Sequence, residues 1–90
     1  MGVKYSQSGK LSEAEACFQQ VLQWQPDNPD AWHLLGGIAA QYKQYSTAIE
    51  RINHAIELKP TESIFYRNLG NIYLGQQQFH LACECYQKAV

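Results

Sequence analysis

Three cysteines are the first side chains to examine for chemistry, because thiolates bind metals and act as nucleophiles. Cys83 and Cys85 form a C-x-C pair, which looks like a metal motif. On a helix, however, two residues at this spacing point to nearly opposite sides and cannot chelate one ion. Cys17 brings the count to three, and an odd count fits poorly with a disulfide framework. We therefore expect reduced thiols, a cytoplasmic location and no metal site.

The histidines are the other candidates for acid–base chemistry or metal binding. His33, His54 and His80 do not share an evident helical face with each other. No Ser/His/Asp or Cys/His set is brought together by spacing, and no glycine-rich phosphate loop follows a strand. The sequence therefore predicts that the chain is not an enzyme and binds no cofactor.

Arg67 and Asn71 form the pair whose spacing points to binding. Residues four apart lie on the same face of a helix. A guanidinium and an amide placed in this way could hold a carboxylate or a peptide carbonyl. The alternative is that Arg67 is a solvated surface residue, paired with Asp30 or Glu62. Both interpretations stay open at this point.

Two helices are predicted in the middle of the chain. Asn28 is a capping side chain, Pro29 suits the first helical position, and Asp30 lies near the positive end of the helix dipole. A second helix is predicted to start near Ser46, with Thr47 and Glu50 at capping-box spacing. The apolar side chains recur at three- and four-residue steps in both helices: Trp32, Leu35, Ala39 and Tyr42, then Ala48, Ile49, Ile52, Ala55 and Ile56. No segment as long as a strand alternates between apolar and polar residues, so no sheet is expected.

The same plan repeats with a fixed period. Gly2, Gly36 and Gly70 are 34 residues apart. Ala14, Ala48 and Ala82 keep this interval, as do Pro26 and Pro60. A period of this length indicates a stack of one small helical unit. The glycines cost helix stability but allow a neighbouring helix to approach closely, with the alanines on the partner helix.

The period divides the chain into a partial unit 1–28, a full unit 29–62 and a partial unit 63–90. In the first unit, Ser12 and Glu15 have capping-box spacing before an apolar stripe that ends at Pro26. We expect a fragment of a longer array, or an array whose uncapped ends pack on other chains. The apolar residues expected to be uncovered at those ends are Met1, Tyr5, Tyr86 and Val90.

These units resemble the tetratricopeptide repeat. The middle unit reads W-x-x-L-G from Trp32, and the third reads Y-x-x-L-G-x-x-Y from Tyr66, each followed by the repeated alanines. The resemblance implies an all-α, right-handed α-solenoid of antiparallel helix pairs, with about three repeats of which the first and last are truncated. It further implies a scaffold that binds proteins in a concave groove lined by the first helix of each unit.

Two segments, Asp30–Gly36 and Arg67–Tyr73, more distantly resemble repeats of O-linked N-acetylglucosamine transferases. Asn68 matches the asparagine column that grips substrate in those arrays, whereas Leu34 does not. Some tetratricopeptide proteins clamp a carboxylate with several Lys, Arg and Asn residues, and only Arg67 and Asn71 fit such a scheme here. We expect the groove to suit an extended, uncharged peptide or an amphipathic helix. The expected partner-binding residues are His33, Gln41, Ile64, Arg67, Asn68, Asn71 and Leu74. In the first unit, Val3, Ser6 and Gln7 are expected to face the same groove.

Charge and hydropathy narrow the partners to proteins or peptides. The net charge is −1, with only seven Lys and Arg residues, so neither nucleic acid nor an anionic membrane surface is expected as a partner. No apolar run approaches the roughly 20 residues that span a bilayer. Two alternatives to peptide binding remain: end-to-end self-association into a homo-oligomer, and substrate recruitment by a larger enzyme such as a glycosyltransferase.

Overall fold

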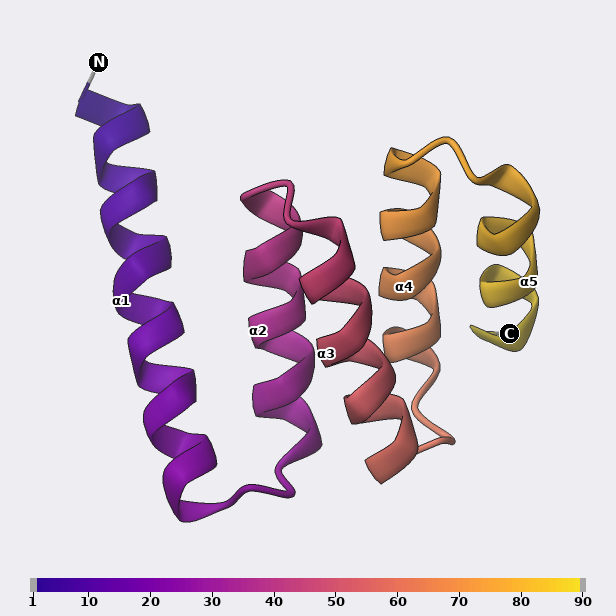
Figure 1. Cartoon of the computed structure of the whole chain (residues 1–90), viewed down its shortest axis with the longest axis horizontal. Helices are drawn as coiled ribbons and strands as arrows, with labels where there is room; N and C mark the ends of the chain where they lie inside the picture. Colours follow the sequence, from indigo (N-terminus) through magenta and orange to yellow (C-terminus); the bar gives the residue numbers. More distant parts are fainter. Residues whose placement is uncertain (1, 90) are drawn as a thin grey trace.

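A computed structural model describes the backbone of residues 2–89 and the side chains of residues 10–89. Met1 and Val90, and the side chains of Val3, Tyr5, Ser6 and Gln7, lie outside this description. The described chain consists of helices joined by short turns and contains no strand (Figure 1). Its helices are α1 (Gly2–Trp24), α2 (Pro29–Gln41), α3 (Tyr45–Leu58), α4 (Ser63–Gly75) and α5 (Phe79–Ala89).

The helices stand side by side in chain order and alternate in direction, as Figure 1 shows. α2 packs closely on α3 and α4 on α5, so the chain forms two helix pairs preceded by one long helix. The molecule is flattened, with extents of 37 × 34 × 19 Å. The predicted fold class, an α-solenoid of antiparallel helix pairs, is confirmed.

The first unit differs from its prediction, because α1 is one continuous helix of 23 residues. Ser12 and Glu15 lie inside it and do not cap a new helix. Gly9 holds the position that Lys43 and Gln77 hold in the later units, but it too is helical. No proline interrupts this segment, and adding one hydrogen bond per residue to an existing helix is easier than starting a second one.

The capping prediction is right for α2 and wrong for α3. The Asn28 side chain accepts a hydrogen bond from the backbone N–H of Ala31 at 3.0 Å. α3 begins at Tyr45, and its N-cap residue, Gln44, makes no side-chain capping bond. Thr47 therefore lies within the first turn, where the backbone is already helical. The preceding turn, not a capping box, fixes where this helix starts.

Two turns of the same shape connect the helices within each pair. Lys43 and Gln77 both have φ of 62°, the left-handed region that ends a helix. The next backbone N–H in each turn reaches back into the preceding helix: Gln44 N to Ala39 O at 2.9 Å, and Gln78 N to Tyr73 O at 2.9 Å. The 34-residue period thus extends to backbone dihedral angles that the sequence does not mark, since neither residue is glycine or asparagine.

The core lies around α3, between α2 and α4. Ala48, Ile52 and Ala55 of α3 have no exposed surface, and Phe65 of α4 is 1% exposed. A Cβ on Gly36 would lie 3.1 Å from the carbonyl oxygen of Ala48, which confirms that the repeated small residues permit close packing.

A second repeated contact fixes the start of α2 and α4. The Trp32 indole N–H donates to the carbonyl of Pro26 at 2.9 Å. The Tyr66 hydroxyl donates to the carbonyl of Pro60 at 2.8 Å. Each aromatic side chain therefore holds the loop that enters its own helix.

Candidate functional site

An exposed face of α4 carries four of the predicted partner-binding residues. Ile64, Arg67, Asn71 and Leu74 follow one another at steps of three, four and three residues, so they lie along one side of the helix. All four are exposed, while Phe65, Leu69 and Ile72 on the other side of α4 are buried. We call these four residues the α4 face. It presents a cation and an amide between two large apolar side chains.

Arg67 makes no ion pair within residues 10–89. The alternative pairing with Glu62 is not formed, because the Glu62 carboxylate lies 3.4 Å from the Lys59 ammonium. Nor does Asp30 pair with it: each described ion pair joins other residues. The guanidinium of Arg67 is therefore an exposed donor group whose charge no described carboxylate neutralises.

The side chain of Asn71 is hydrogen-bonded to the last helix, α5. The Tyr86 hydroxyl on α5 donates to Oδ1 of Asn71 at 2.5 Å. This contact corrects the expectation that Tyr86 is uncovered at the end of the chain: the side chain is half-buried and lies against α4. The exposed apolar side chain of α5 is Phe79 instead, at 63%. Self-association through the ends stays a prediction, which sedimentation at several concentrations tests.

Asn68 and His33 form a bridge between α4 and α2. The amide nitrogen of Asn68 contacts Nε2 of His33, and the imidazole lies over Phe65 with ring centroids 4.8 Å apart. Burial lowers the pKa of His33, against the opposing influence of the Asp30 and Glu62 carboxylates. A neutral imidazole whose Nε2 accepts from an amide carries its proton on Nδ1. Both residues are half-buried, and the bridge engages the Asn68 amide that the resemblance assigned to ligand binding.

Gln41 lies apart from these residues. It is the last residue of α2 and is exposed, and no hydrogen bond among residues 10–89 joins its side chain to the α4 face. Gly37, in the column of Asn71 one unit earlier, has open space beside it, since a Cβ there would meet nothing within 4 Å. The structure thus brings His33 and Asn68 into contact, places four residues on the α4 face, and leaves Gln41 separate.

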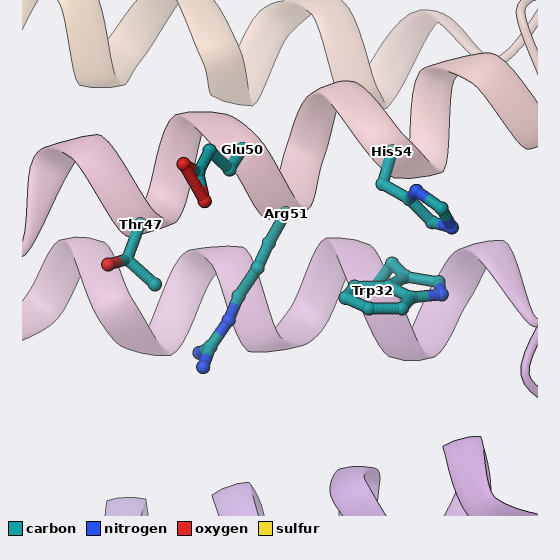
Figure 2. A pocket seen from close by; sticks show the side chains of 5 residues that line it. All are labelled: Trp32, Thr47, Glu50, Arg51 and His54. Carbon is teal, nitrogen blue, oxygen red and sulfur yellow. The ribbon is translucent and has the colours of Figure 1, made fainter.

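A pocket of about 360 Å³ is lined by side chains of α2 and α3. The sequence did not predict it. Figure 2 shows Arg51 extending from α3 across α2, and the rings of Trp32 and His54 facing each other. These rings are 4.3 Å apart at 53°. Thr47 and Glu50 complete the lining.

Arg51 in this pocket is already engaged by the protein. Its guanidinium donates to the carbonyl of Leu35 at 3.2 Å and lies 3.7 Å from the Glu15 carboxylate of α1. Arg51 therefore connects α1, α2 and α3, and its charge is already paired within the protein. The repeat pattern offers one signal for this role: Arg51 and Cys85 are 34 residues apart and so occupy equivalent positions, and Cys85 is buried.

The thiols show no arrangement for catalysis. Cys17 and Cys83 are exposed and Cys85 is buried, and all three are free. Burial raises the pKa of Cys85, with Lys88 opposing, which makes it a poor nucleophile. Within the described residues no cluster of three or more His, Cys, Asp or Glu side chains could hold a metal ion. In the same part of the chain, no helix combines the length and hydropathy needed to cross a membrane.

Comparison with known sequences identifies the protein family that has this helical architecture. A family model described as Tetratricopeptide repeat matches residues 5–69, and a second with the same description matches residues 65–90. The chain belongs to the tetratricopeptide repeat family. One relative is the peroxisomal targeting signal receptor of Komagataella phaffii, 33% identical over 76 residues. That match covers 83% of this chain but only 13% of the receptor, so the chain spans a small part of the curated relatives it matches.

Solved tetratricopeptide structures have the same fold. The O-GlcNAc transferase of Thermobaculum terrenum superposes with a TM-score of 0.85 at 30% identity, covering 96% of this chain and 16% of that protein. The first tetratricopeptide domain of Spaghetti (RPAP3), solved bound to an HSP90 peptide, gives a TM-score of 0.83 at 24% identity. It covers 98% of this chain and 70% of that domain. The resemblance to transferase arrays is confirmed at the level of the repeat region. Family and relatives together support a role in protein–protein interaction in general.

Proposed function

We propose that this chain is a protein–protein interaction module that binds a segment of another protein on the α4 face. The observation that carries the proposal is Arg67, an exposed guanidinium with no described counter-ion, between the exposed apolar side chains of Ile64 and Leu74. An unpaired arginine beside exposed apolar groups is typical of binding surfaces. The similarity to a receptor of a targeting signal is consistent with such a module.

The ligand in this proposal is an extended segment with an acceptor group between two apolar side chains. Arg67 and Asn71 donate to its carbonyl or carboxylate, and Ile64 and Leu74 contact the flanking side chains. The open space at Gly37 leaves room for the ligand backbone beside α2. His33 and Asn68 hold α2 and α4 at the separation that the ligand meets, and Gln41 lies at the far end of α2. We further propose that the chain is divided into the repeat units 1–28, 29–62 and 63–90.

Selection from a peptide library tests this function. A random 12-residue library displayed on phage supplies ligands, and their affinities are measured for the wild type and for Arg67→Ala/Asn71→Ala. We expect the double variant to lose affinity by about tenfold or more, since the lost hydrogen bond from the charged Arg67 guanidinium alone is worth about 1.5–3 kcal/mol. Lys88→Ala, an exposed cation on α5 that makes no ion pair among the described residues, is the matched control. Equal affinity of the double variant and the wild type would remove these residues from the site.

A second candidate is that the chain recruits substrate for a larger enzyme. The observation in its favour is the similarity to the repeat region of an O-GlcNAc transferase at 30% identity. The role of the α4 face would be the same, with the bound segment being a substrate of a catalytic domain on the same polypeptide. The complete coding sequence of the gene decides between the two candidates, since the second requires a catalytic domain on the same polypeptide.

A further inference from the structure

Tyr86 crosses from the second helix of the last pair to the α4 face. Its ring lies against the α4 backbone at Gly70, where a Cβ would be 2.8 Å from Cε1 and 3.0 Å from Cδ1 of the ring. Any larger residue at position 70 would occupy the space through which the ring passes. The glycine thus admits an aromatic side chain that reaches the next residue, Asn71.

The hydroxyl of Tyr86 engages one particular atom of Asn71. It donates to Oδ1 at 2.5 Å, which uses the acceptor side of the amide. The amide nitrogen with its two N–H groups then remains for other partners. One helical turn away on the same face, the Arg67 guanidinium offers donors only. Both polar groups of the α4 face therefore present donors.

The middle unit has no equivalent arrangement. The positions 34 residues before Tyr86 and Asn71 hold Ile52 and Gly37. Ile52 fills the space beside Gly36 with an apolar side chain, and Gly37 offers no amide. Of the two helix pairs, only α4 and α5 have this contact, so the fold does not require it.

We propose that Tyr86 is a positioning residue for ligand binding: it orients the Asn71 amide so that its N–H groups donate beside Arg67, a role that rests on the proposed function of the α4 face. The site then selects hydrogen-bond acceptors, and a ligand presenting a donor at this point is rejected. Tyr86 itself need not touch the ligand, because its ring lies over Gly70 and its hydroxyl is engaged by Asn71.

The first test needs no ligand. Side-chain ¹⁵N relaxation reports the order of the Asn71 amide in the wild type and in Tyr86→Phe, which loses only the hydroxyl. The Asn71 amide is expected to be ordered in the wild type and, in the variant, as mobile as that of the exposed Asn53. Tyr66→Phe is the matched control, since it removes a hydroxyl that donates to a carbonyl at the start of the same helix. Equal order of Asn71 in the wild type and in Tyr86→Phe overturns the positioning role.

The second test uses a peptide obtained from the phage-displayed library. Tyr86→Phe is expected to weaken its binding by about threefold to tenfold, the value of one hydrogen bond, and to have no effect in an Asn71→Ala background. Asn71→Asp keeps an acceptor for Tyr86 but has no donor, and is expected to bind as weakly as Asn71→Ala. An equal loss from Tyr86→Phe in both backgrounds means that Tyr86 acts through the fold and not through Asn71. If no selected peptide depends on Arg67, the proposed function fails, while the relaxation measurement still decides whether Tyr86 orients the Asn71 amide.

Discussion

Gly36 and Ile52 are in such close contact that no side chain fits between them. A Cβ built on Gly36 would lie 2.5 Å from Cγ1 of Ile52, closer than real Cβ atoms approach any neighbour. Ile52 has no exposed surface and cannot move into solvent to make room. The helices α2 and α3 can therefore pack at this distance only because residue 36 has no Cβ. This explains why a glycine is found inside a helix at this position.

Gly36→Ala is expected to lower the free energy of unfolding by about 1–3 kcal/mol, because overpacking a filled core forces side chains from their rotamers. The neighbouring Gly37→Ala is the matched control. Its Cβ meets open space, so the variant is expected to gain up to about 1 kcal/mol from the better helix propensity of alanine. Urea unfolding followed by circular dichroism measures both. Equal effects of the two substitutions would contradict the packing explanation.

Lys43→Gly is expected to stabilise the chain. The φ of 62° at Lys43 costs a residue with a Cβ about 1–2 kcal/mol, and glycine adopts this conformation without that cost, although it loses more chain entropy on folding. We expect a net gain of about 0.5–1 kcal/mol in the free energy of unfolding. Lys88→Gly, in the last turn of α5, removes the same side chain from a helix and is expected to destabilise. A loss of stability in both variants would mean that the turn tolerates lysine without strain.

The partial burial of His33 makes stability depend on pH. Burial holds the pKa of His33 in the folded state below its ordinary value of 6.5, so the unfolded chain binds the proton more readily. The stabilisation is complete above about pH 6.5 and decreases as the pH falls from there toward the folded-state pKa. Urea unfolding between pH 7.5 and 5.5 should show a larger loss for the wild type than for His33→Gln. His54 and His80 are present in both proteins, so parallel curves would contradict the assignment to His33.

Arg51 connects α1 to the helix pairs, so its loss should act on α1. Arg51→Ala is expected to speed amide hydrogen exchange in residues 10–24 by about tenfold, through loss of the bond to the Leu35 carbonyl and of the pairing with Glu15. Exchange in α4 and α5 should not change. Glu15→Ala separates the two contributions and should have a small effect, since the ion pair is long and partly exposed. Uniformly faster exchange in all five helices would show that Arg51 supports the whole fold.

The fold could be predicted from the sequence because its period is carried by residue types with a packing role. Gly36, Gly70 and Ala48 are small where helices meet, and the structure places them there. The start of α3 was predicted to within one residue, but the turn that precedes it could not be predicted, because it depends on the left-handed backbone of Lys43, a residue with no preference for that conformation. The continuous α1 was missed for the opposite reason: Gly9 favours a turn that the structure does not make there.

The candidate site could be predicted only within a single helix. The spacing of Arg67 and Asn71 places them on one face because both belong to α4. Contacts between helices were not predictable in this way. Tyr86 reaches Asn71 only because Gly70 leaves room for its ring, and His33 meets Asn68 only because two units pack at one particular distance.

Chemical-shift mapping of a selected peptide tests the central claim most directly. A peptide from the phage-displayed library is titrated into ¹⁵N-labelled protein, and the backbone and side-chain amide resonances are followed. The largest shifts are expected on Ile64, Arg67, Asn71 and Leu74, with smaller ones near Gly37 and His33. Shifts concentrated instead on Trp32, Arg51 and His54 would place the ligand in the pocket lined by α2 and α3, and would contradict binding on the α4 face.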